Sequence, residues 1–519
     1  MSPARTSALR PTMCGMDTGE PGDARPDSPA EDRPHPAAES DRISPPISAP
    51  ISSPISSPIS LPPSVLPSDP AGRGSTAATW ALTLLLVAVV ALGATLVRGS
   101  LHDRETVPPA AAPSPSTSEA QRPTPDPVQE REAALAMILD RRAAAVLAGD
   151  PAGWSVVVDQ TSVDFAARQA AVMANMAAVP FATFEYDFAG PGLALSPERQ
   201  QALGEDAWVA RVILAYRLAD ADTADVRREL FYTVVRRSGQ WLLADDTDGP
   251  SALDLWDLGP VQVVRGDRSL VVGTGEAAAL QAYADQTDVS AALVDEVWGV
   301  VWPRVVVVVV PGDQAQMAGL LQRDDQTGLE QIAAVTTGEV GLPSGGSADR
   351  IIVNPAGFDQ LDEVSRGVVL THEITHVATR STSALDAPIW LSEGFADYVA
   401  YQGTELPRRS VAADVLELVR AGTGPTALPD AAAFDPANGD IAPAYSGSWL
   451  AAELVARTYG QEVLVEFYRA VTGTGVVAAL DDEAPSQRAR VDEAFRSVLG
   501  TEQALFVQQW QAYLGELAA

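Results

Sequence analysis

The chain has 519 residues, 46% of them hydrophobic, a length that allows about three domains and a composition that supplies folded cores. Its net charge is −33, with 68 acids against 35 basic residues that are all arginine, so it is not expected to bind a nucleic-acid phosphate backbone. The single cysteine, Cys14, excludes an intrachain disulfide and a cysteine-based metal centre, which leaves histidine and carboxylate side chains as metal ligands.

The N-terminal quarter of the chain has three compositions. Residues 1–75 are rich in Pro, Ser, Ala and Asp and predict a disordered tail, because such a segment buries too little apolar surface to fold. Residues 76–97 contain no charge and would span about 33 Å as a helix, which predicts one transmembrane helix. A buried core helix is the alternative, and the disordered flanks disfavour it. Residues 98–127 predict a Pro-rich linker.

The expected location is the cell membrane, with a single pass. The apolar stretch begins too far from the N-terminus for an ordinary cleaved signal peptide. Arg73 flanks one side, and Arg98 and Arg104 flank the other, so the nearby charges do not favour a cytoplasmic N-terminus. The linker is similar to a stalk that lifts domains off a membrane, and on that ground we expect the C-terminal domains to be extracytoplasmic.

Residues 128–250 predict a separate α+β module. A helical pattern over residues 128–148 ends at a Gly-Asp-Pro stop. Strand-like runs follow at residues 181–188, 208–218 and 230–243, the last broken by a Ser-Gly turn. This order resembles the SnoaL-like or cystatin-like modules, on pattern alone. Asp245 and Asp246 are expected on a solvated face, and the module is interpreted as a spacer or binding module.

Residues 255–519 predict a second α+β unit. A strand at 269–272 precedes an alanine-rich helix and the run 305–310, whose six valines suit a strand buried on both faces. A short strand at 350–354 precedes a helix over about 361–379. Only helices are expected from there to the C-terminus, which places the chemistry at the junction of strands and helices.

The helix at 361–379 carries the sequence HEITH at residues 372 to 376. Positions i and i+4 lie on one face of a helix, so His372 and His376 can direct ring nitrogens at one Zn²⁺ ion. Glu373 lies one step around the helix, beside the metal, where its carboxylate suits a general base. The chain has four histidines in all, so this pairing is unlikely to arise by chance.

A catalytic zinc site needs a third protein ligand and an open fourth position. Glu393, on a second helix that begins near Leu391, is the best candidate for that ligand. Asp397 lies four residues further on the same face, where it can accept a hydrogen bond from a zinc-bound histidine. The sequence therefore predicts one zinc ion per chain.

HExxH followed by WLSEGFAD at 390 to 397 resembles the gluzincin metallopeptidases, in particular the peptidase MA-like group related to aminopeptidase N and thermolysin. The resemblance implies a zincin-like domain over about 260–519, with a small mixed sheet and a helical C-terminal part. It implies the zinc ligands His372, His376 and Glu393, the general base Glu373 and the supporting acid Asp397. It also implies that Tyr445 stabilises the oxyanion and that residues 350–354 form the edge strand that pairs with substrate.

Two features depart from that family. Sixteen residues separate His376 from Glu393, fewer than in the better-known branches. No G-x-M-E-N stretch precedes HEITH, so the sequence does not support exopeptidase activity. We expect a membrane-anchored zinc peptidase acting on a peptide or protein. The alternative is a catalytically silent zinc-binding surface or sensor protein that binds a partner through its middle module. Oligomeric state is left open.

Overall fold

The computed structural model describes residues 126–519 except 324–325, 327–328, 330–331, 338–347, 436–437 and 474–485. These residues fall within one compact unit of the chain. The predicted tail, membrane helix and nearly all of the linker lie outside them. None of the described helices is long and apolar enough to cross a bilayer.

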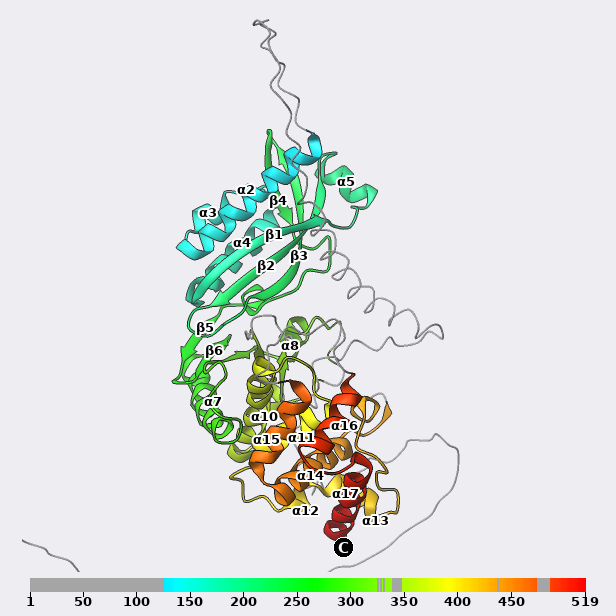
Figure 1. Cartoon of the computed structure of the whole chain (residues 1–519). Helices are drawn as coiled ribbons and strands as arrows, with labels where there is room; N and C mark the ends of the chain where they lie inside the picture. The colour runs from blue at the N-terminus through cyan, green and yellow to red at the C-terminus, as the bar shows by residue number, and fades with distance from the viewer. Residues whose placement is uncertain are drawn as a thin grey trace, which may run out of the picture. The chain divides into compact units, whose positions relative to one another are not determined.

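The first folded part is built on a four-stranded antiparallel sheet (Figure 1) in the order β1-β2-β3-β4. The strands are β1 (Phe181–Pro191), β2 (Trp208–Leu218), β3 (Val226–Arg237) and β4 (Gln240–Asp245). The predicted run 230–243 is a hairpin of β3 and β4. Ser238 and Gly239 turn the chain with φ angles of 52° and 82°, the positive values of a two-residue hairpin turn.

Helices cover this sheet: α2 (Pro127–Ala148), α3 (Pro151–Ser155), α4 (Val163–Asn175) and the short α5 (Pro197–Leu203). Asp126 caps α2 and Gly149 ends it in the left-handed conformation. The apolar stripe of α2 packs on the sheet through Leu135 and Leu139. Asp245 and Asp246 are partly buried in ion pairs with Arg168, and not on a free solvated face.

The second part contains a mixed five-stranded sheet in the order β5-β6-β7-β9-β8. The strands are β5 (Gln262–Arg265), β6 (Ser269–Gly273), β7 (Val306–Val310), β8 (Ala334–Thr337) and β9 (Arg350–Val353). β6, β7 and β9 run parallel, and the outer pairs are antiparallel. The long helix α7 (Ala277–Trp298) joins β6 to β7, and the valine run is a buried strand as predicted.

The prediction that residues 350–354 form the edge strand was wrong. β9 has a partner on each side, β7 and β8, so its backbone groups are already paired. Among the described strands, β8 is the edge beside β9. β8 was not predicted, because four residues give too short a pattern to separate a strand from a loop.

The other described elements of the chain are helices. The predicted helix 361–379 is α10 (Glu363–Thr382), and α11 (Ile389–Ala400) follows it. The others are α6 (Leu255–Leu258), α8 (Gln314–Leu320), α9 (Pro355–Phe358), α12 (Arg408–Val411), α13 (Ala413–Arg420), α14 (Ala442–Tyr459), α15 (Gln461–Thr472), α16 (Gln487–Ser497) and α17 (Gln503–Ala518). One large core joins the sheet to α7, α10, α11, α14 and α15.

A buried ion pair links the two sheets. Asp222, in the loop between β2 and β3, accepts hydrogen bonds of 2.7 and 2.8 Å from the guanidinium of Arg350 on β9. Both side chains are almost fully buried, at 2% and 5% exposure. The fork geometry satisfies both carboxylate oxygens of Asp222.

Candidate metal centre

Helix α10 carries the HEITH residues inside the protein. It begins after Asp362, whose carboxylate accepts a hydrogen bond from the backbone N–H of Ser365. The helix is buried nearly all round because α7, α11 and β8 pack against it. Its polar residues are therefore held in a dry environment, where each needs a partner.

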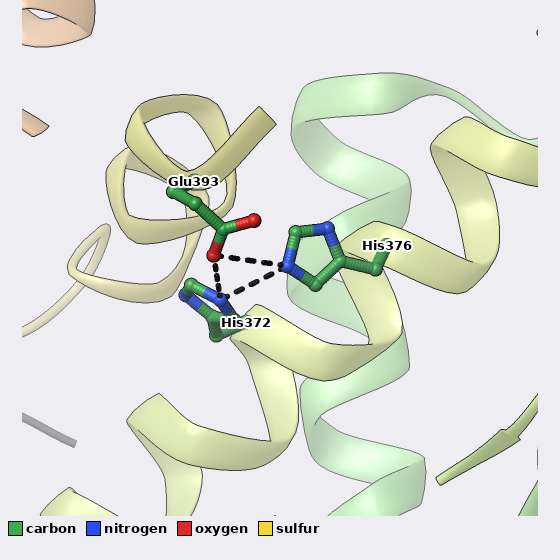
Figure 2. Close-up of side chains that lie close together, drawn as sticks. All are labelled: His372, His376 and Glu393. Carbon is green, nitrogen blue, oxygen red and sulfur yellow. Dashed lines mark hydrogen bonds and ion pairs between the residues drawn. The ribbon is translucent and has the colours of Figure 1, made fainter. Parts of the chain in front are cut away.

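The two histidines and Glu393 converge on one point (Figure 2). The Nε2 atoms of His372 and His376 are 3.0 Å apart. Oε2 of Glu393 lies 3.3 Å from the first nitrogen and 3.5 Å from the second, without a well-directed hydrogen bond to either. These ligand atoms all lie within 4.8 Å of one another, and all three side chains are buried.

This arrangement fits a zinc ion. Zinc binds imidazole nitrogen and carboxylate oxygen at about 2.0–2.2 Å in tetrahedral geometry, which separates ligand atoms by about 3.3 Å. The three separations in this site bracket that value. Two ring nitrogens and a carboxylate oxygen that face one another at these distances form an arrangement that a shared cation stabilises.

Asp397 orients one of the rings. Its Oδ1 atom lies 2.7 Å from Nδ1 of His372, and the carboxylate is buried. Nδ1 donates to this carboxylate, which leaves the Nε2 lone pair of His372 for a metal. The second ring is held less firmly, because the Ser392 hydroxyl approaches Nδ1 of His376 at 3.5 Å, the limit for a hydrogen bond.

In the metal site, burial and the neighbouring charges shift the pKa values of the same side chains in opposite directions. Burial alone would lower the pKa of His372, but the carboxylates of Asp397 and Glu393 outweigh it and hold this pKa well above its usual range. Burial would raise the pKa of Glu393, but the two histidines outweigh it and hold that pKa below its usual range. For Asp397, burial wins and raises the pKa. The carboxylate of Glu393 is thus kept ionised beside both rings.

Glu373 is separate from the three converging side chains. Its Oε2 atom accepts a 2.6 Å hydrogen bond from the hydroxyl of Thr336, on the edge strand β8. The same hydroxyl lies 3.2 Å from the backbone carbonyl of Glu373. Sequence reasoning missed Thr336, because it is 37 positions from Glu373 and carries no local motif.

Tyr445 lies in the first turn of α14, buried, with its ring edge-on to Phe434 at 5.1 Å. Its hydroxyl has no hydrogen-bond partner among the described residues. Burial raises its pKa well above the usual value, and the charges of Glu393, Asp397 and Glu373 add to that effect. The phenol is therefore within electrostatic reach of all three acids and remains a donor.

The short segment between α10 and α11 is tied to another helix. The backbone N–H groups of Ala384 and Leu385 both donate to the carbonyl of Thr472, at the end of α15, at 3.1 and 3.0 Å. Pro388 then precedes the first turn of α11. The sixteen-residue spacing is thus closed by a direct, anchored turn.

Gly394 allows α11 and α14 to meet closely. A Cβ atom at this position would lie 2.3 Å from the backbone carbonyl oxygen of Ser448 on α14. The glycine of WLSEGFAD is therefore a packing requirement next to Glu393. Trp390 and Trp449 belong to the large core.

A cavity of about 630 Å³ adjoins Glu393. Ser392 and Trp390 line it from α11, Arg380 from α10 and Tyr468 from α15. Arg380 and Tyr468 were not predicted as site residues, since single polar residues on scattered helices leave no local pattern.

The site thus places two histidines and a glutamate around one point, with Glu373 next to His372 in the sequence. The sequence matches no protein-family profile and no curated protein.

Among solved structures, an M1 zinc metallopeptidase from Deinococcus radiodurans is similar over 59% of this chain and 61% of that chain, with a TM-score of 0.31 and 16% identity. A mutant of that enzyme gives a TM-score of 0.31 and 17% identity over the same shares. A two-domain M1 zinc metallopeptidase mutant bound to L-arginine gives a TM-score of 0.31 and 16% identity. The chain thus spans about three-fifths of these proteins. A TM-score of 0.31 is too low to assign a function, so the function is inferred from the geometry of the site.

Proposed function

We propose that the protein is a zinc-dependent peptidase that hydrolyses peptide bonds with a metal-activated water. The observation that carries the proposal is the convergence of His372, His376 and Glu393 with Glu373 held beside them. A zinc ion held by these ligands would lower the pKa of its bound water towards 7 and polarise the substrate carbonyl.

The remaining steps belong to side chains of the chain itself. Glu373 takes the proton from the attacking water and passes it to the leaving nitrogen. Thr336 holds the Glu373 carboxylate through its 2.6 Å hydrogen bond. Tyr445, whose hydroxyl is unpaired among the described residues, donates to the developing oxyanion.

Replacing Glu373 by Gln tests this assignment. The variant should bind one zinc per chain, as the wild type does, because Glu373 is not a ligand. Cleavage of a mixed peptide pool should fall at least about 100-fold, the usual contribution of a general base. New termini are counted by mass spectrometry, and zinc by elemental analysis.

The outcomes separate the proposal from the silent zinc-binding alternative. Zinc binding without cleavage by the wild type supports the alternative. Cleavage that survives in the Gln variant contradicts the role of Glu373. A wild-type chain that stays metal-free after zinc reconstitution contradicts both functions.

Membrane anchoring by residues 76–97, with the folded domains outside the cytoplasm, is a separate proposal that rests on the sequence alone. Membrane fractionation of the full chain, with protease accessibility in intact cells, tests it. Recovery of the full chain in the soluble fraction contradicts it.

A further inference from the structure

The cavity beside Glu393 is lined by one cation that forms no ion pair with another described residue. Arg380 is the only basic side chain among the described residues that line it. Three acids, Asp386, Glu393 and Asp430, also line it, together with apolar groups and neutral polar side chains such as those of Ser392, Tyr468, Gln487 and Gln503. A guanidinium group in such a lining can pair locally with a negatively charged group of a ligand.

Arg380 lies on the same face of α10 as the predicted catalytic residues. It follows His376 by four positions and Glu373 by seven, which is one and two helical turns. Its Nη1 atom donates to the backbone carbonyl of Thr336 at 3.3 Å. The hydroxyl of the same Thr336 binds Glu373. Arg380 is therefore on the same helix face as the predicted base, two turns further along, and contacts the same residue of β8.

The charge of Arg380 has no counterion among the described residues. No carboxylate lies within 4.0 Å of its guanidinium in the part of the chain that the structure describes, and its one hydrogen bond is the contact with Thr336. By contrast, Arg350, Arg268 and Arg199 each form an ion pair. A guanidinium has five N–H donors, so most of those of Arg380 remain for a ligand. The side chain is only partly buried and can be reached from the cavity.

Of the three acids that line the cavity, Glu393 belongs to the proposed metal site, and the other two form no ion pair with Arg380. Asp430 accepts hydrogen bonds from the backbone N–H groups of Ala432 and Ala433 at 3.1 and 3.2 Å. Asp386 is exposed, and its charge acts on Arg490.

We infer that Arg380 binds a substrate carboxylate, so that the preferred substrates are peptides with a carboxylate close to the cleaved bond. This inference rests on the proposed peptidase function. Glu373 and Arg380 are separated by about 10 Å along the helix axis, which corresponds to about three residues of extended peptide. The carboxylate is either an acidic side chain within that distance or a free C-terminus.

The test compares matched peptides that differ in this group alone. In the first kind of pair, the two peptides have Glu or Gln at one position within three residues of a bond that the wild type cleaves, and both ends are blocked. One such pair is made for each position. A second pair ends in a free carboxylate or an amide. The wild type should cleave the acidic member of one pair with a kcat/KM about tenfold higher or more, since a charge-assisted hydrogen bond is at stake. The pair that shows the preference identifies the source of the carboxylate.

Arg380→Gln should bring this ratio close to one, and Arg380→Lys should keep part of the preference. Arg366→Gln is the matched control: this arginine is on the same helix but donates to the backbone carbonyls of Phe358 and Asp359, so the ratio should not change. A wild-type ratio near one in both pairs overturns the inference. So does an Arg380→Gln variant that lowers both members of a pair equally.

Binding to the zinc-loaded Glu373→Gln variant separates this inference from the peptidase proposal. The probes are a blocked hexapeptide with one glutamate, its glutamine counterpart, and the glutamine peptide with a free C-terminus. Tighter binding of an acidic probe that Arg380→Gln abolishes supports the carboxylate site even if no peptide is cleaved. Cleavage by the wild type with equal binding of all probes supports the peptidase and overturns the carboxylate site.

Discussion

Asp397 contacts the proposed metal site through one hydrogen bond to the ring of His372. Asp397→Asn keeps the size of the side chain but removes the charge that fixes the ring and increases its basicity. Zinc affinity should fall about 10- to 100-fold. Competition with a chromophoric chelator measures the affinity. Asp285→Asn, on the exposed face of α7, is the matched control and should leave it unchanged. Equal affinity in Asp397→Asn and wild type would contradict the supporting role.

Thr336 makes the corresponding contact to Glu373. Thr336→Val preserves the shape but leaves the carboxylate without this donor, so kcat should fall roughly tenfold or more. Zinc affinity should stay constant, because Thr336 does not contact a ligand. Thr337→Val is the control, since its hydroxyl faces the carbonyl of Arg350 at 3.4 Å. A loss of zinc in Thr336→Val would assign it a structural role instead.

At the scale of elements, the close approach of α11 and α14 depends on Gly394. Gly394→Ala would place a methyl group against the backbone of Ser448 and force the helices apart. We expect a loss of about 1–3 kcal/mol in the free energy of unfolding, together with weaker zinc binding, because Glu393 is the adjacent residue. Denaturant titration of the zinc-free protein measures the first effect.

Gly515→Ala is the control for that substitution. Gly515 lies inside α17 with no atom within 4 Å of an added Cβ. Alanine is favoured over glycine in a helix, so this change should stabilise the protein by about 0.5–1 kcal/mol. Equal effects of the two substitutions would rule out the proposed steric contact.

The elements that a local pattern defines were predicted from the sequence. α10 and α11 follow from their helical spacing, and the two HEITH histidines with Glu393 and Asp397 follow from positions one turn apart. β8 and its Thr336 were not predicted, because the pairing of β8 with β9 depends on tertiary contacts that a four-residue sequence does not encode. The position of Arg380 in the cavity lining was not predicted for the same reason, because it depends on which groups surround this side chain in the folded chain.

At the scale of the whole molecule, the buried pair of Asp222 and Arg350 connects the two sheets. Asp222→Asn would leave the Arg350 charge buried without its counterion, at a cost of about 3–5 kcal/mol. Thermal or urea unfolding of the full chain measures it. Asp225→Asn, which breaks an exposed pair with Arg217 nearby, should cost no more than about 1 kcal/mol. A similar small effect for both would show that the link between the sheets does not depend on this pair.

The anchored turn between α10 and α11 has a kinetic consequence. The carbonyl of Thr472 binds the backbone N–H groups of Ala384 and Leu385, so folding alone brings α10 and α11 together. The metal site is therefore formed before zinc binds. Uptake should then proceed in a single fast phase whose rate rises linearly with zinc concentration, and the far-ultraviolet circular dichroism should hardly change.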